Sequence, residues 1–316
     1  MDSAPVTVSV VVCTYDRGLV LDRAVRSLVT QTLDFSRYEV IVVDNGTPDG
    51  TQAVVRRLQA QYPAVRLLLI EEPRQGLSYA RNTGTRGGSG QYIAFIDDDA
   101  VAPPEWLQTI AETIEACHVR PTAVGGPILP LYEALKPAWF KDEYETRTCG
   151  TTERLLRRGE TLSGSNMAFE KCALERSGGF AVHLGMRGDL LSVGEETDLQ
   201  WRMQRDLVHA NAFLYSPAIW VRHSVPAAKM TVSYRLSRSM VAGHVAGMAA
   251  EPSMAAIARA LASVAVGVAR VGCACILGRK QRYAYLENWA VEALSPLAGK
   301  VGWLVGCLRV PLRVRR

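Results

Sequence analysis

Short apolar runs alternate with helical stripes over the first hundred residues of this 316-residue chain, and this alternation restricts the fold more than any other feature. Apolar, β-branched runs predict buried strands at 6–13, 39–43, 65–70 and 92–96. Apolar residues spaced three and four apart predict helices at 19–33, 53–62 and 77–85. Strands joined through helices form right-handed crossovers, so we expect an α/β fold with a mostly parallel sheet flanked by helices.

Polar residues follow three of the predicted strands at the point where each strand ends. They are Thr14-Tyr15-Asp16, Asp44-Asn45-Gly46 and Asp97-Asp98-Asp99. Ligands of open parallel sheets bind in the crevice at the carboxyl ends of the strands. Acids at three strand ends suit a base edge, a ribose and a divalent cation. The dehydrogenase interpretation is disfavoured because the first strand leads into no G-x-G-x-x-G turn, and no P-loop is present either.

The chain changes character after Pro226, where it becomes rich in Ala, Val and Leu. We therefore expect an α/β domain over 1–225 and a helical region over 226–316. Arg259 and Arg270 interrupt the apolar run 255–277, and two arginines make a bilayer-spanning helix expensive. An interfacial helix, or one packed on the domain, is the expected structure.

Charge and cysteine usage bear on partners and location. The net charge is +5, and the most obvious basic cluster lies beside apolar residues, which favours an anionic membrane surface over nucleic acid. The cluster comprises Arg309, Arg313, Arg315 and Arg316. Seven scattered cysteines lack redox or zinc-ligand spacing, and 1–12 lacks the features of a secretory signal. We expect a cytoplasmic protein, peripheral on the inner face of a membrane.

Several motifs occur in a fixed order between about residues 6 and 223. They read VSVVVCTYDR, VIVVDNGTPDGT, GLSYARNTG, YIAFIDDDAVAPPEWL, GSNMAFEK, GGF, GEETDLQWR and VRH. Together they make the sequence resemble the glycosyltransferase family 2 enzymes of the GT-A fold. The resemblance implies an inverting transfer of a sugar from a nucleotide-sugar donor.

The acid triplet indicates a metal site, because clustered carboxylates repel one another unless a cation or hydrogen-bond donors compensate. By resemblance to the family's DxD motif, Asp99 is the best metal ligand, with Asp97 and Asp98 nearer the ribose and the first ligand shell. His223 stands where some relatives place a further metal ligand, and the ion would be Mn²⁺ or Mg²⁺. The competing interpretations are a solvated acidic turn and a histidine that only caps a strand.

The resemblance assigns the nucleotide to the loops after the first two strands. Asp44 would accept the N–H of the base, with Thr14 and Tyr15 beside it and Asp16 and Arg17 in the same loop. An Asx turn at Asp44 and a packed core tyrosine are the alternatives. Arg81 would pair with a phosphate, unless it only forms a surface salt bridge.

The acidic segment 194–199 is where the family places its proton acceptor. Glu196 occupies the position of the base, which is commonly an aspartate, and Glu195 or Asp198 could serve instead. The competing interpretation is a helix N-terminus that favours acids through the macrodipole. The half after Gly125 looks like the acceptor side, with Gly126, Asn166 and Trp201 as substrate-binding candidates.

The expected function is therefore transfer from a donor, by preference a UDP-sugar, to a hydroxyl of a glycan, a lipid or a small molecule. Two alternatives remain open. A non-catalytic nucleotide-sugar or carbohydrate-binding module would keep Asp44 and the aspartates without needing Glu196. A sugar nucleotidyltransferase is disfavoured because no Gly-rich, basic phosphate loop follows the first strand.

Overall fold

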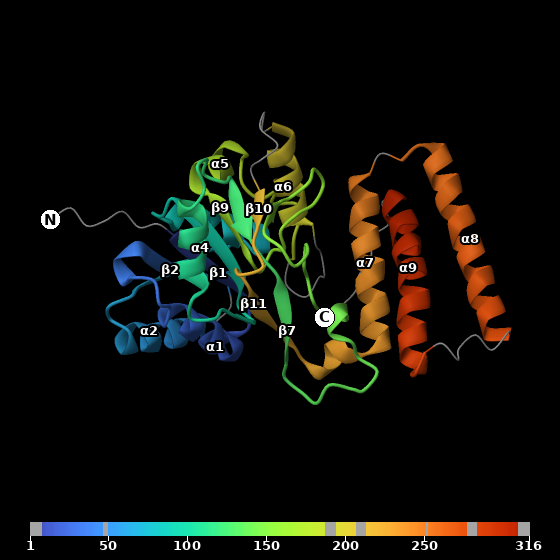
Figure 1. Cartoon of the computed structure of the whole chain (residues 1–316), viewed down its shortest axis with the longest axis horizontal. Coiled ribbons are helices and arrows are strands. Elements are labelled where there is room, and N and C mark those ends of the chain that lie inside the picture. The colour runs from blue at the N-terminus through green and yellow to red at the C-terminus, as the bar shows by residue number, and fades with distance from the viewer. Residues whose placement is uncertain are drawn as a thin grey trace. The chain divides into compact units, whose positions relative to one another are not determined.

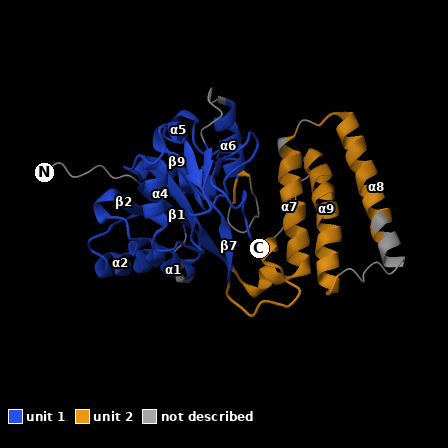
Figure 2. Cartoon of the chain, in the orientation of Figure 1, with its two compact units in different colours: residues 1–131, 145–184, 195–224 blue, residues 132–144, 185–194, 225–316 orange. Residues whose placement is uncertain are grey.

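The computed structural model describes residues 8–46, 50–186, 194–206, 213–250, 252–276 and 283–308. The terminal arginines of the basic cluster lie outside these residues. The chain forms two compact units (Figure 2). Unit 1 comprises 1–131, 145–184 and 195–224, and unit 2 comprises 132–144, 185–194 and 225–316. The short segments 132–144 and 185–194, which the sequence placed in the first domain, thus cluster with unit 2.

An eight-stranded sheet forms the centre of unit 1, in the order β3-β2-β1-β4-β9-β6-β10-β8. The bounds are β1 Val8–Thr14, β2 Tyr38–Asp44, β3 Arg66–Glu71, β4 Tyr92–Asp97, β6 Ala123–Gly125, β8 Arg154–Leu155, β9 Met167–Glu170 and β10 Phe213–Tyr215. The first four strands in this order are parallel, as expected. In contrast, β9 runs antiparallel to both of its neighbours.

Helices cover both faces of this sheet (Figure 1). They are α1 Gly18–Val29, α2 Thr51–Gln61, α3 Leu77–Gly87, α4 Trp106–Glu115, α5 Lys171–Arg176 and α6 Glu195–Asp206. The core on one face includes α1, α2 and α4, and the core on the other includes α3, α5 and α6. The first helix is shorter than predicted because Leu33, although buried, lies in the loop beyond it.

A second sheet has the order β5-β11-β7, with β5 Ala100–Val101, β7 Ile128–Tyr132 and β11 Val221–Val225. Strand β11 pairs antiparallel with β5, and the register sets His223 opposite Ala100. Because Ala100 directly follows the acid triplet, this pairing joins chain segments more than a hundred residues apart.

Unit 2 contains the long helices α7 Val232–Ala249, α8 Met254–Ile276 and α9 Leu286–Cys307, as the composition after Pro226 predicted. Short 3-10 turns occupy Asp142–Tyr144 and Ala227–Met230, and a third, Phe35–Arg37, belongs to unit 1. In the described part of the chain, no helix is long and apolar enough to cross a bilayer.

Glycines bring the backbones of α7 and α9 into direct contact. A Cβ added at Gly243 would lie 1.9 Å from the carbonyl oxygen of Gly299, and one at Gly302 would lie 2.0 Å from that of Met240. No residue larger than glycine fits at either position without separating the helices. The sequence analysis recognised helices here but not the glycines that set their spacing.

Candidate active site

The acid triplet lies at the carboxyl end of β4, between that strand and β5. An Arg17 nitrogen lies 3.1 Å from a carboxylate oxygen of Asp98 and 2.9 Å from one of Asp99. Burial raises the pKa of Asp98 to about 6, although Arg17 opposes this shift. The triplet is therefore a partly buried cluster with a specific cationic partner, and the interpretation as a freely solvated turn is wrong.

His223 completes this cluster because the β5–β11 register carries its ring to the triplet. Its Nε2 atom lies 3.0 Å from an Asp99 oxygen and 3.5 Å from an Asp97 oxygen. Nδ1 lies 3.2 Å from the carbonyl oxygen of Ser224. The ring therefore faces the acids rather than only closing a strand.

Asp97, Asp99 and His223 each offer one ligand atom, and these atoms lie within 4.8 Å of one another. Two carboxylates and an imidazole form a donor set that suits Mn²⁺ and tolerates Mg²⁺. Burial opposes ionisation of Asp97, but the hydrogen bond with His223 and the charge of Arg81 hold its pKa below the usual range. The residues present thus fit a divalent cation.

Arg81, from α3, is the buried cation of the site, and its side chain is only 4% exposed. It donates to a Glu195 oxygen at 2.8 Å and to the carbonyl oxygen of Gly164 at 3.3 Å, and it lies 3.5 Å from Asp97. Its guanidinium also lies 5.3 Å from the centre of the Phe180 ring. The surface-salt-bridge alternative is wrong, and a phosphate contact stays a prediction that this enclosed geometry does not favour.

Glu195 and Glu196 form a carboxyl pair at the start of α6. Glu195 is buried and Glu196 half-buried, and among the described residues the Oε2 atom of each has no hydrogen-bond partner. Burial and the charge of Glu196 raise the pKa of Glu195 to about 8, against the opposing charge of Arg81. One guanidinium cannot neutralise Asp97 and both glutamates, so the pair holds a proton at neutral pH.

Asp198, the third acid of the segment, forms a salt bridge with an arginine of the same helix. Its carboxylate accepts from Arg202 at 2.9 Å, one helical turn later, and its side chain is 36% exposed. The helix-terminus interpretation is therefore correct as far as it goes, since all three acids lie in the first turn of α6. It does not explain why Glu195 contacts a buried arginine.

The predicted nucleotide loops lie at the carboxyl edge of β1 and β2. Asp44 is 6% exposed and accepts from the Gly46 N–H at 3.1 Å, so the Asx turn is present. Thr14 is buried, and the hydroxyl of half-buried Tyr15 accepts from Gln75 at 2.6 Å. Asp16 is exposed with a φ of 55°, in the left-handed region. Their contacts with a nucleotide stay predictions.

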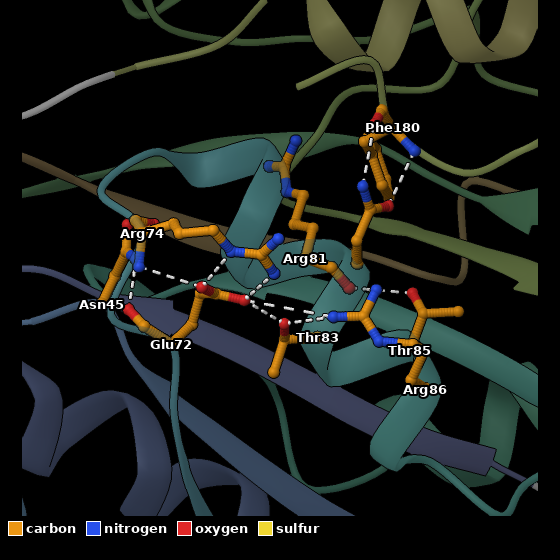
Figure 3. A network of polar contacts seen from close by, with 9 residues as sticks. Asn45, Glu72, Arg74, Arg81, Thr83, Thr85, Arg86 and Phe180 are labelled. Atoms are coloured by element: carbon orange, nitrogen blue, oxygen red, sulfur yellow. Dashed lines mark hydrogen bonds and ion pairs between the residues drawn. The ribbon is translucent and has the colours of Figure 1, made fainter. Parts of the chain in front are cut away.

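The turn after β3 is a part of the site edge that the sequence analysis missed. The Glu72 carboxylate accepts 2.8 Å bonds from two Arg74 side-chain nitrogens and a 2.5 Å bond from Thr83 (Figure 3). The Asn45 amide donates to the carbonyl oxygens of Glu72 and Arg74. This network ties the loop after β2 to the loop after β3. The sequence signal for it was the polar run after the third strand, which ends in Gly76. In the structure Gly76 has a φ of 144°.

Two of the three substrate-binding candidates have internal roles instead. Asn166 is 0% exposed: its Oδ1 accepts from Trp106, and its Nδ2 donates to the carbonyl oxygens of Pro127 and Ile219. A Cβ at Gly126 would lie 1.9 Å from that Ile219 oxygen. The internal hydrogen bonds of Asn166 and the close packing at Gly126 do not favour a substrate contact, and both assignments stay predictions. Trp201 is 55% exposed and is available for one.

Comparison with known proteins gives a consistent result. The model of the family "Glycosyl transferase family 2" matches residues 9–152. Residues 9–152 therefore resemble the family 2 glycosyltransferases. It is 32% identical over 190 residues to the glucosyl-dolichyl phosphate glucuronosyltransferase of Haloferax volcanii, covering 58% of each protein. It is 27% identical over 260 residues to the succinoglycan biosynthesis protein ExoM of Rhizobium meliloti, covering 78% of this chain and 76% of that protein.

The curated relatives are longer than the matched region. The chain spans 58% and 61% of the lengths of the two Haloferax volcanii glycosyltransferases that it matches. Among solved structures, the mannosyltransferase PcManGT of Pyrobaculum calidifontis, in complex with GDP-Man and Mn²⁺, is 21% identical. It aligns with a TM-score of 0.61 over 96% of this chain and 90% of that one. TarS of S. aureus in complex with UDP aligns with a TM-score of 0.52 over 79% of this chain and 68% of that one. The GT-A fold is thereby confirmed.

Proposed function

We propose that this protein is an inverting glycosyltransferase that moves a sugar from a nucleotide-sugar donor to an acceptor hydroxyl. The observation that carries the proposal is the pairing of two acid clusters around Arg81. Asp97 and Asp99 belong to one cluster, Glu195 and Glu196 belong to the other, and Arg81 contacts both. A donor needs a cation and an acceptor needs a base, and the two acid clusters could supply one each on either side of Arg81.

On the donor side, Asp97, Asp99 and His223 would hold the divalent cation. When bound, such an ion acts as a Lewis acid that offsets negative charge on the leaving nucleoside diphosphate. Asp44, Thr14 and Tyr15 would hold the base, with a UDP-sugar as the preferred donor. Support comes from solved neighbours in complex with GDP-Man and Mn²⁺, with UDP and with UDP-GlcNAc.

On the acceptor side, Glu196 is the base. Glu195 forms a salt bridge with buried Arg81 and Asp198 forms one with Arg202, whereas Glu196 forms none within the described residues. Glu196 takes the proton of the acceptor hydroxyl as its oxygen bonds to the anomeric carbon of the donor. The bond from that carbon to the diphosphate breaks in the same step, which inverts the configuration.

The acceptor is a hydroxyl on a glycan, a lipid-linked sugar or a small molecule. The names of the relatives support the first two classes: one is a GalNAc(5)-diNAcBac-PP-undecaprenol β-1,3-glucosyltransferase and another takes part in succinoglycan biosynthesis. We expect no nucleic-acid partner.

A thermal-shift measurement tests the donor half of this proposal. Nucleotides and nucleotide-sugars should raise the melting temperature only with Mn²⁺ or Mg²⁺ present, because ligand binding to the native state stabilises it. Asp99→Ala should remove the metal-dependent part of the shift. The matched control is Glu112→Ala, which removes an exposed carboxylate from α4. An unchanged nucleotide shift in excess EDTA would contradict the metal requirement.

Unit 2 is the part that we propose to contact an anionic membrane surface, on its cytoplasmic side. Helix α8 exposes Met254, Leu261, Val266 and Val268, the last three by 51–59% of their surfaces. Exposed apolar helix residues can enter the headgroup boundary, and nearby basic residues add attraction to anionic lipid. Flotation with phosphatidylglycerol vesicles at low salt tests this, and a full-length chain that stays at the bottom of the gradient rules it out.

A further inference from the structure

The segment 159–164 runs antiparallel along α6 and is fastened to it at three levels. A Cβ at Gly164 would lie 3.6 Å from the carboxyl carbon of Glu196. Leu162 and the Gln200 amide exchange hydrogen bonds of 2.7 and 2.9 Å. Gly159 donates to Gln204 at 2.9 Å, and Gln204 donates to the carbonyl oxygen of Glu160 at 2.7 Å. A continuous wall therefore leads from Glu196 to the turn at 157–160.

A pocket of about 360 Å³ lies where this turn meets the outer part of α6. Its lining contains three arginines, Arg158, Arg202 and Arg205, and one aspartate, Asp198, so its formal charge is +2. Trp201 also lines it, and this indole is the one tryptophan among the exposed large apolar side chains of the described residues. A broad aromatic face thus stands among guanidinium groups in a concave site.

The lining has a fixed part and an available part. Arg202 is held by Asp198 at 2.9 Å and by the carbonyl oxygen of Gly179 at 2.7 Å, so it shapes the pocket floor. Arg158 is exposed on the turn that Gln204 anchors, and Trp201 presents more than half of its surface to solvent. Neither is needed to complete the core of unit 1.

We propose that this pocket binds an anionic sugar unit, a uronate, of the acceptor glycan. The inference rests on the proposed transferase function and names the acceptor class. A guanidinium pairs with a carboxylate or phosphate through two parallel hydrogen bonds, and an indole offers a flat apolar face to the C–H face of a sugar ring.

The position of the pocket favours the acceptor over the donor. Trp201 follows Glu196 by five residues on the same helix, which is about 7.5 Å along the helix axis. The proposed metal ligands Asp97, Asp99 and His223 lie at the end of β4 and on β11, and none of the three lines the pocket. An acceptor that extends from Glu196 along the segment 159–164 would place a later unit in this pocket.

Calorimetric titration of the full-length protein tests the proposal with tetragalacturonate as the probe. Its methyl ester, which has no charge, is the matched neutral ligand and should bind at least tenfold more weakly. Trp201→Ala and Arg158→Glu should each weaken tetragalacturonate binding by about tenfold or more, since one charge-assisted contact accounts for that much. Trp201→Phe keeps an aromatic face and should restore binding to within about threefold. Arg56→Glu, at an exposed position of α2, should change nothing.

Four results would overturn the proposal. The first is that wild type and the pocket variants bind tetragalacturonate equally, and the second is that wild type binds the neutral ester as tightly as the acid. The third is that inorganic phosphate competes at the concentration at which tetragalacturonate binds. The fourth is that the pocket binds phosphatidylglycerol vesicles or poly-U in place of tetragalacturonate. The nucleotide thermal shift with Mn²⁺, measured on the same variants, separates this from the proposed function. If the wild type shows that shift but ignores the tetramer, the pocket assignment alone fails. If it shows no nucleotide shift, the transferase proposal fails.

Discussion

The two acid clusters of unit 1 are balanced in different ways. Asp98 and Asp99 form salt bridges with Arg17, a loop residue whose side chain is 27% exposed. Asp99 also contacts the imidazole of His223. Glu195 forms a salt bridge with Arg81, a helix residue whose side chain is 4% exposed and also contacts Asp97. A counter-charge at the surface can be exchanged for a metal ion, whereas a buried one cannot leave. The first cluster is therefore suited to binding and release, and the second to holding protons in fixed places.

The largest effect should come from Glu196→Gln, which tests the proton-handling side of this comparison. The amide keeps the shape of the side chain and loses its basicity, so sugar transfer should slow by ~10²–10⁴-fold. Donor binding with Mn²⁺, followed by thermal shift, should stay near that of wild type. Turnover assayed as nucleoside diphosphate release measures the loss.

Glu195→Gln and Asp198→Asn are the matched controls for that substitution. Glu195 already carries a proton at neutral pH, so its amide should retain more transfer activity than Glu196→Gln does. Asp198→Asn weakens only the pair with Arg202 and should leave turnover within a few-fold of wild type. If either control abolishes transfer while Glu196→Gln stays active, the base is that neighbour.

The grouping of Asp97 and Asp99 could be predicted from the sequence because local rules place both residues. Asp97 and Asp99 follow a buried apolar strand, and the carboxyl ends of such strands face the ligand crevice. The resemblance to family 2 supplied His223. The register that brings His223 beside Ala100 is a tertiary fact, and no spacing in the chain encodes it.

The interior partners could not be predicted in the same way. Arg81 and Glu195 are 114 residues apart, and an arginine in a helix suits a phosphate and a carboxylate equally well in sequence terms. Asn166 looked polar and therefore available, yet the fold uses its amide to join Trp106, Pro127 and Ile219. The antiparallel insertion of β9 was missed because four-residue apolar runs carry no direction.

The next effect compares the two arginines directly. Arg81→Met removes the buried cation that contacts Glu195 and Asp97, and it should cost ~3–5 kcal/mol of stability. Arg17→Met removes a partly exposed partner and should cost less than about 1 kcal/mol. Melting temperatures of both variants without metal measure the difference. Equal losses would mean that the two clusters are balanced alike.

The smallest effect is a pH dependence that belongs to the second cluster alone. Burial and the charge of Glu196 raise the pKa of Glu195 to about 8, from an ordinary value of 4.5. Between these values the folded state holds a proton that the unfolded chain has released. Stability from this group is therefore complete below about pH 4.5 and is lost as the pH rises toward 8.

Glu195→Gln is neutral at every pH and should not show this loss. Melting temperatures of both proteins at pH 5 and pH 8, without metal, should show wild type falling further by up to ~3 kcal/mol, at ~1.4 kcal/mol per pH unit, or roughly 6–12 °C in a domain of this size. Arg81, Asp97 and Glu196 face the group and are present in both proteins, so the difference between the two curves isolates Glu195. Parallel curves would show that Glu195 is ionised beside Arg81 and that the pair holds no proton.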